Sequence, residues 1–121
     1  MDQKKNLYND ECPMLHTLNI ISRKWRLPII WSLSHGSLRY NELKRELSGI
    51  TNIMLTRSLQ DLEELGLVKR IPHKELTPHV EYVLTDHATH LVPAIQAIQE
   101  WGEEHLLLEK DMADGLTEAD V

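Results

Sequence analysis

Two short amphipathic segments joined by a tight turn constrain the fold of this chain more than any other feature. The first segment is expected to be helical from Glu42 to Leu47, and the second from Asn52 to Leu65. Gly49 lies in the turn, Thr51 can cap the second helix, and Gly66 follows its last residue. The inward positions recur at helical spacing: Leu43, Leu47, Leu55, Leu59 and Leu62, with Met54 as a weaker candidate. Two helices joined by so short a turn predict a helix-turn-helix.

The flanking segments extend this motif. Residues 67–71 and 80–84 are typical of strands, and the segment 72–79 between them has proline at both ends and is too long for a tight hairpin. We expect a strand-loop-strand projection, or wing. Two helices are predicted upstream, Pro13–Ser22 and Trp25–Ser34, followed by a short extended stretch, Leu38–Tyr40. Asn41 is expected to cap the helix that comes next. One long helix, Asp86–Leu107, is predicted downstream, with Thr85 as its cap. The predicted fold is therefore mainly α with a small β-hairpin (α+β), a winged helix-turn-helix.

Charge is divided unevenly along the chain. The net charge is −6, but residues 1–83 hold 12 of the 13 Lys and Arg and 10 of the 19 Asp and Glu, a net charge of +2. Residues 84–121 carry −8, so the acidic total does not exclude nucleic acid as a partner of the first part. With 121 residues we expect one domain, 12–107, between a flexible segment, 1–11, and an acidic, disordered tail, 108–121.

An ordered set of short motifs covers residues 12–105. They are Cys12-Pro13, Thr17-Leu18-Asn19-Ile20-Ile21, Lys24-Trp25, Leu38-Arg39-Tyr40-Asn41-Glu42-Leu43, Gly49-Ile50-Thr51, Leu55-Thr56, Leu59, Leu62-Glu63, Gly66-Leu67-Val68, Pro78-His79-Val80-Glu81-Tyr82-Val83-Leu84-Thr85 and Trp101-Gly102. Together they resemble the HxlR-type winged-helix transcriptional regulators. The resemblance implies a dimeric, cytoplasmic, bacterial-type regulator that binds a pseudo-palindromic operator. Three departures from the family pattern, Ser22-Arg23, Ile53 and Ala88, bear on the phosphate contacts rather than on the fold.

The second helix of a helix-turn-helix enters the major groove with its first turns near the base edges. Arg can bind guanine with two hydrogen bonds, Asn or Gln can bind adenine in the same way, and Ile can contact a thymine methyl group. The helix face opposite the leucines is therefore expected to read bases, with Arg57 as the strongest candidate: Asn52, Ile53, Thr56, Arg57 and Gln60. Phosphate contacts are expected from the basic residues of the first helix, its flank and the wing: Lys24, Arg39, Lys44, Arg45, His73, Lys74 and His79. The alternative is a solvated surface with ordinary ion pairs.

The last helix carries a wider apolar stripe than one packed face needs: Leu91, Val92, Ala94, Ile95, Ala97, Ile98 and Trp101. The first helix could add Met14, Leu15, Leu18 and Ile21. One thick core could absorb all of these residues. We favour a two-fold homodimer, in which the two reading helices lie about 34 Å apart, one turn of B-DNA.

Cys12 precedes Pro13 at a helix start, where free backbone N–H groups stabilise a thiolate. His16 follows one turn later and could lie near the sulfur. In many members of the family that the chain resembles, the cysteine ahead of the first helix senses oxidants or electrophiles. We therefore expect Cys12, aided by His16, to sense a small electrophile or oxidant. The alternative is an inert packed cysteine.

Several other classes are disfavoured. A single cysteine and the lack of an apolar run of about 18 residues predict a cytoplasmic protein with no membrane contact. His87 and His90 share a helical face, but no further converging ligands are visible, so no metal site is expected. No nucleophile elbow, phosphate loop or dinucleotide motif is present, which predicts neither an enzyme nor a cofactor. The second hypothesis is a winged-helix protein-interaction module without DNA binding.

Overall fold

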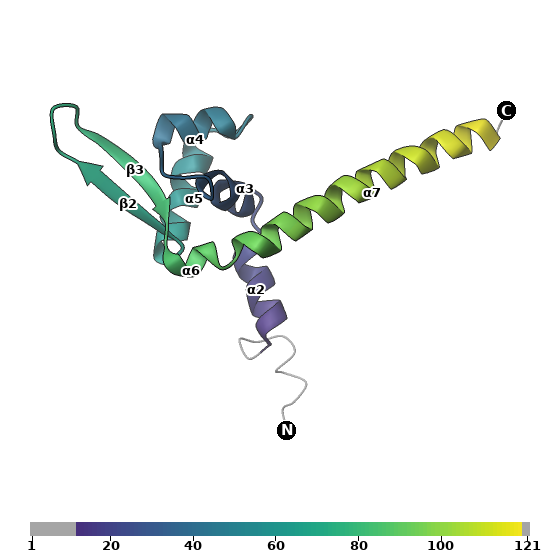
Figure 1. Cartoon of the computed structure of the whole chain (residues 1–121), viewed down its shortest axis with the longest axis horizontal. Coiled ribbons are helices and arrows are strands. Elements are labelled where there is room, and N and C mark those ends of the chain that lie inside the picture. Colours follow the sequence, from purple (N-terminus) through teal and green to yellow (C-terminus); the bar gives the residue numbers. More distant parts are fainter. Residues whose placement is uncertain (1–11, 120–121) are drawn as a thin grey trace, which may run out of the picture. The chain divides into compact units, whose positions relative to one another are not determined.

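The structure is a computed structural model that describes residues 12–119, with side chains described as far as residue 115. The elements follow in the order α2 (Pro13–Ile21), α3 (Arg26–Leu33), β1 (Leu38–Arg39), α4 (Tyr40–Glu46), α5 (Asn52–Glu64), β2 (Val68–His73), β3 (His79–Leu84), α6 (Asp86–Thr89) and α7 (Val92–Ala119) (Figure 1). The described residues up to Thr89 form one compact unit and those from His90 onward a second. The predicted flexible segment, 1–11, lies outside the described residues.

Helices α4 and α5 form the predicted helix-turn-helix. The hydroxyl of Thr51 accepts a hydrogen bond from the backbone N–H of Met54 at 3.1 Å, which confirms Thr51 as the cap of α5. Gly49, in the turn, has φ +92°, a conformation that other residues rarely adopt. The prediction that Asn41 caps α4 is wrong. The helix begins at Tyr40, because the carboxylate of Glu42 accepts the backbone N–H of the preceding residue, Arg39, at 2.7 Å.

The end of α5 depends on Gly66, which has φ +76°. Its N–H bonds to the Glu63 carbonyl at 3.0 Å, and the N–H of Leu67 bonds to the Leu62 carbonyl at 2.9 Å. These two bonds satisfy carbonyls that have no partner inside the helix, as in a Schellman motif. The chain then turns directly into β2, so the wing begins where the reading helix ends.

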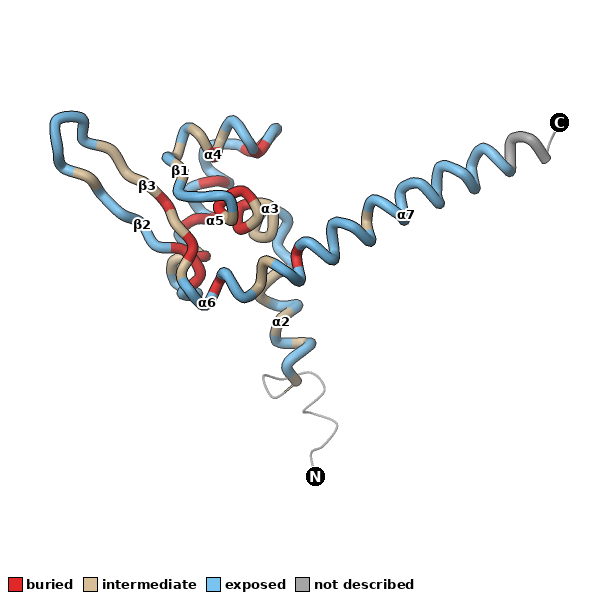
Figure 2. Tube along the Cα trace, in the orientation of Figure 1, coloured by how far each residue is buried: buried red, intermediate tan, exposed pale blue. Residues whose placement is uncertain are grey.

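The core of the first unit lies between α3, α4, α5 and the sheet (Figure 2). Its largest fully buried side chains are Ile29, Ile30, Leu43, Leu55, Leu59 and Leu62. The five predicted inward leucines of α4 and α5 are all buried, whereas Met54 is 39% exposed and lies at the edge of the core. Burial of one face of α5 leaves its opposite face turned outward.

The wing belongs to a three-stranded antiparallel sheet with the order β1-β3-β2. In β2 and β3, Val68 pairs with Leu84 at the base and His73 pairs with His79 near the tip. Pro72 lies within β2 rather than in the loop, and this is compatible with the sheet because β2 is an edge strand. Figure 1 shows this hairpin extending from the helices of the first unit. The mainly α fold with a small sheet is thus the predicted winged helix-turn-helix.

The C-terminal part differs from prediction in two ways. The expected single helix is interrupted after Thr89, and α7 starts at Val92. Pro93 explains the interruption, because proline lacks an N–H and clashes with the preceding turn inside a helix but fits in a first turn. The expected disordered tail from 108 is wrong over most of its length, since α7 continues to Ala119. Among the described residues, no helix combines the length and apolar character needed to cross a membrane.

Candidate DNA-binding surface

The outward side of α5 carries the five residues expected to read bases. We call Asn52, Ile53, Thr56, Arg57 and Gln60 the reading face. All five are exposed and together line one shallow hollow. Ile53 is 70% exposed, which is a large exposure for a branched apolar side chain. Leu55, Leu59 and Leu62 fix the rotation of α5 about its axis by packing into the core, so the reading face is held outward.

Tyr40, the first residue of α4, holds the start of α5. Its hydroxyl lies 3.1 Å from the backbone carbonyl and 3.3 Å from Oδ1 of Asn52. The same hydroxyl lies 3.1 Å from Oγ1 of Thr56. Tyr40 thus links α4 to two members of the reading face, Asn52 and Thr56, and limits their rotamers. Tyr40 is not among the site residues predicted from the sequence, and its place just before the predicted α4 is the only local signal for it.

Removing this hydroxyl is expected to loosen the reading face without unfolding the protein. In a Tyr40→Phe variant the contacts to Asn52 and Thr56 are lost while the ring remains. A net hydrogen bond contributes about 1 kcal/mol, so we expect operator affinity to fall about 3- to 10-fold. Fluorescence anisotropy on labelled operator DNA measures this change, and thermal unfolding is the control for stability. Unchanged affinity would show that Tyr40 does not position the reading face.

Asp61, the first acidic residue after the reading face in the sequence, is paired within the protein. Oδ2 of Asp61 lies 3.1 Å from Nη2 of Arg26, whose side chain is 12% exposed. Nη1 of Arg26 donates to the Ile20 carbonyl at 2.7 Å, so one guanidinium joins the end of α2 to α5. Residues 52–60 contain no acidic residue, and the ion pair with Arg26 partly neutralises Asp61, the first one that follows. The exposed end of α5 therefore keeps a positive local charge from Arg57.

The predicted phosphate contacts fall into two groups around the helix-turn-helix. Arg39, Arg45 and His79 line one hollow beside the start of α4. Lys24 and Arg57 line a second, together with Arg23. In that group, Nζ of Lys24 lies 5.0 Å from the centre of the Trp25 ring, within reach of a cation–π contact.

The remaining basic residues are placed separately. Lys44 is half-buried on α4, and Lys74 is exposed in the loop of the wing. Two further exposed cations, Lys69 and Arg70 on β2, were not among the predicted residues. Their adjacency just before the wing loop was the available signal. They extend the positive charge from the helices along the wing.

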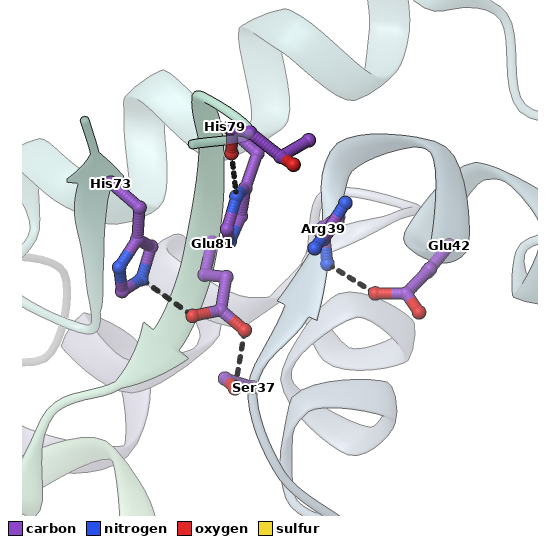
Figure 3. A network of polar contacts seen from close by, with 7 residues as sticks. Ser37, Arg39, Glu42, His73, His79 and Glu81 are labelled. Atoms are coloured by element: carbon purple, nitrogen blue, oxygen red, sulfur yellow. Dashed lines mark hydrogen bonds and ion pairs between the residues drawn. The ribbon is translucent and has the colours of Figure 1, made fainter. Parts of the chain in front are cut away.

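His73 is directed at a carboxylate rather than at solvent. Its Nε2 lies 2.6 Å from Oε1 of Glu81, and its ring stacks on His79 with centroids 4.6 Å apart (Figure 3). Desolvation works to raise the pKa of Glu81, but the hydrogen bond from Ser37 and the contact with His73 outweigh it, so this pKa lies below its ordinary value. His73 is therefore a weaker candidate for a phosphate contact than Lys74.

Cys12 is the N-cap residue of α2 and is half-buried. Its backbone is extended, with φ −92° and ψ 107°, and its carbonyl accepts the N–H of His16 at 2.9 Å. The thiol thus lies at the helix end where the N–H groups have no intrahelical partners, as the sequence predicted. His16 is exposed one turn further along α2.

Comparisons with known proteins agree with this geometry. The pattern of the HxlR-like helix-turn-helix family matches residues 20–110. The HTH-type transcriptional regulator YybR of Bacillus subtilis (strain 168) is 37% identical over 119 residues, which cover 96% of this chain and 95% of YybR. A MarR-family transcriptional regulator from Porphyromonas gingivalis W83 is 38% identical with a TM-score of 0.75, over 79% of this chain and 94% of that one.

The redox regulator HypR in its reduced form is also similar, with 36% identity and a TM-score of 0.75 over 81% of this chain and 98% of HypR. The family match spans most of the chain, from α2 into α7, and includes the helix-turn-helix and the wing. The relatives are winged-helix regulators of similar length. This chain therefore belongs to the HxlR-like helix-turn-helix family of transcriptional regulators.

Proposed function

We propose that this protein is a sequence-specific, double-stranded DNA-binding transcriptional regulator that acts as a homodimer on a pseudo-palindromic operator. The observation that carries the proposal is the reading face: five exposed side chains with base-reading chemistry on one side of the second helix of a helix-turn-helix. A solvated helix face needs no support from a buried or partly buried neighbour. This one is supported by Tyr40, whose hydroxyl lies 3.1 Å from the Asn52 carbonyl and 3.1 Å from Oγ1 of Thr56.

The surrounding charges favour the same surface. Arg39 and Arg45 lie beside the start of α4, Lys24 lies near Arg57, and Lys74 is at the wing tip. Cations at these places flank the reading face and suit phosphates on either side of a groove. The acidic residues that make the total charge negative are concentrated after residue 84. The DNA-facing part can therefore be locally attractive to phosphate in a protein with a net charge of −6.

The homodimer is supported by α7. Residues on this helix alternate at spacings of four and three, as at the contact positions of paired helices: Ala94, Ile98, Trp101, His105, Leu108 and Met112. In the single chain Ile98 is 52%, Trp101 63% and Met112 66% exposed. A helix of this length with such a stripe exposed to water is unfavourable alone. We call these six residues the α7 stripe, and its proposed occupant is the α7 of a second copy.

Binding to DNA is the direct test. The purified protein is titrated onto a labelled inverted-repeat fragment from its own genomic neighbourhood and onto a scrambled fragment of equal length. We expect tighter binding to the first, with affinity that falls steeply as salt rises. No binding to any inverted-repeat fragment from the neighbourhood, with the protein folded and dimeric, would favour the alternative, a protein-interaction module.

We also propose that thiol chemistry at Cys12 controls DNA binding in the cytoplasm. The placement of the thiol at the start of α2 supports this, and two similar structures are a redox regulator, HypR, and a diamide-treated form of YodB. Diamide takes up two electrons and two protons while two thiols become a disulfide, either between Cys12 and the partner's Cys12 or between Cys12 and a small thiol. A quinone can instead alkylate the thiolate. Either product changes the surroundings of α2.

A Cys12→Ser variant is expected to bind operator as the parent does but to lose its response to diamide. In the parent, an oxidised Cys12 should change operator affinity about tenfold, a common size for coupling between two sites. The variant should change less than twofold, since serine cannot form a disulfide. Anisotropy before and after diamide, with dithiothreitol to reverse the effect, measures both. An equal response in the variant would place the sensor elsewhere.

A further inference from the structure

Two histidines and a glutamate converge near the tip of the wing. His73 on β2 and His79 on β3 are directly opposite in the strand register, and Glu81 lies two residues beyond His79. Alternation along a strand puts His79 and Glu81 on the same face. One potential ligand atom from each of the three lies within 4.8 Å of the other two. Figure 3 shows both imidazoles next to the Glu81 side chain.

Neighbouring groups hydrogen-bond to His79 and Glu81 and hold their side chains in place, as outer contacts do for the ligands of a metal ion. Nδ1 of His79 lies 2.7 Å from the Thr77 carbonyl. A carbonyl oxygen only accepts hydrogen bonds, so Nδ1 is the donor, and in the neutral ring the lone pair is then on Nε2. Oγ of Ser37 donates to Oε2 of Glu81 at 3.2 Å, which leaves Oε1 for a second interaction. Such outer contacts to backbone carbonyls and hydroxyls are typical around metal ligands.

The third side chain is not fully satisfied by protein. Nε2 of His73 is buried and lies 2.6 Å from Oε1 of Glu81, yet within the described part of the chain it has no aligned hydrogen-bond partner. A cation held between Nε2 of His73 and Oε1 of Glu81 would give this buried nitrogen a partner.

We propose that His73, His79 and Glu81 bind one divalent first-row transition-metal ion of the Zn²⁺ type, with water completing the coordination. Two imidazoles and one carboxylate suit Zn²⁺, Co²⁺ or Ni²⁺ and not Mg²⁺, which prefers oxygen ligands. Bonds of about 2.0–2.2 Å in a tetrahedron place ligand atoms about 3.4 Å apart. The atoms, now within 4.8 Å of one another, reach that spacing when the stacked rings rotate.

No metal site is predicted from the sequence, because His87 and His90 share a helical face without further converging ligands. The wing cluster depends on strand pairing, which brings together residues six and eight positions apart. Arg39, on β1, pairs with Glu81 in the strand register and is labelled in Figure 3, and its exposed side chain can turn toward solvent. If the proposed DNA binding holds, a bound ion adds positive charge to the wing.

Metal binding is measured on the 121-residue protein without DNA, so its failure would not affect the proposed function. A Cys12→Ser background removes the thiol as a ligand. Zn²⁺ titration by calorimetry and Co²⁺ titration by visible absorption should show one ion per chain, with no comparable binding of Mg²⁺. We expect His73→Ala, His79→Ala and Glu81→Gln each to weaken Zn²⁺ binding at least tenfold, with circular dichroism unchanged.

His35→Ala is the matched control. His35 also contacts an aromatic ring, that of Trp31, with ring centroids 5.3 Å apart, and its Nδ1 lies 3.5 Å from Oγ of Ser34, but among the described residues it belongs to no cluster of three ligands. Zn²⁺ affinity in this variant should equal that of its background. The proposal is overturned if the folded protein binds no Zn²⁺ in the micromolar range, if the three wing substitutions leave the affinity unchanged, or if Mg²⁺ binds equally well.

Discussion

An Arg57→Ala variant is expected to lose site-specific DNA binding while it keeps its fold and its dimeric state. Arg57 is exposed on the reading face, and its guanidinium can make two hydrogen bonds to one guanine. Each such contact contributes about 1–3 kcal/mol of discrimination, and a dimer makes two of them, so operator affinity should fall at least 30-fold. Competition between operator and scrambled DNA measures the loss, with thermal unfolding as the stability control.

An Arg57→Lys variant separates shape from charge. Lysine keeps the positive charge but lacks the planar fork, so nonspecific affinity should stay near that of the parent while the preference for the operator falls. Arg70→Ala provides a contrast, because this exposed wing residue is expected to affect all sequences alike. If Arg57→Ala binds operator as tightly as the parent, Arg57 does not belong to the base-reading surface.

The helix-turn-helix was predictable because its signals are local. Thr51 caps α5 through a residue three positions away, and Gly66 ends it in a left-handed conformation that other residues disfavour. The leucine spacing determines which side of α5 is buried. Once that side is known, the opposite side follows from helix geometry, and so the reading face could be named from sequence alone.

The predicted boundaries of α4 and of the C-terminal helix differ from the structure for local reasons. The carboxylate of Glu42 accepts the N–H of Arg39, so α4 starts ahead of Asn41, the predicted cap. Pro93 interrupts the C-terminal helix and becomes part of a new first turn. Past Leu107 the sequence is acidic, but it is also rich in good helix formers, and helix propensity together with Leu108 and Met112 at helical spacing accounts for the extension to Ala119.

The supporting contacts of the site could not be predicted, because they join residues that are far apart in sequence. Tyr40 reaches Asn52 and Thr56, and Arg26 reaches Asp61 across 35 residues. The partners in the wing depend on strand register, and a shift of one residue would turn His79 and Glu81 to the other face of the sheet. Periodicity reveals which side chains face outward, whereas packing decides which of them are held in place.

Acidic substitutions in the α7 stripe are expected to produce the largest loss of operator binding. In an Ile98→Glu, Trp101→Glu double variant, like charges meet across the proposed two-fold axis where apolar side chains would otherwise be buried. Linking two half-site contacts raises affinity by about 10²- to 10⁴-fold over one, so a monomer should lose a factor of that size. Light scattering should show the mass fall from about twice 14.1 kDa to the mass of a single chain.

A Gln96→Glu, Gln99→Glu variant is the matched control, because it adds the same charge at exposed polar positions of the same helix. It should remain dimeric and bind operator within about twofold of the parent, since surface charge away from the contact has small effects. The winged-helix unit of the Ile98→Glu, Trp101→Glu monomer should still bind one half-site weakly with an intact reading face. A dimer of unchanged stability in that variant would exclude the α7 stripe as the interface, because two buried glutamates per chain are incompatible with a packed apolar contact.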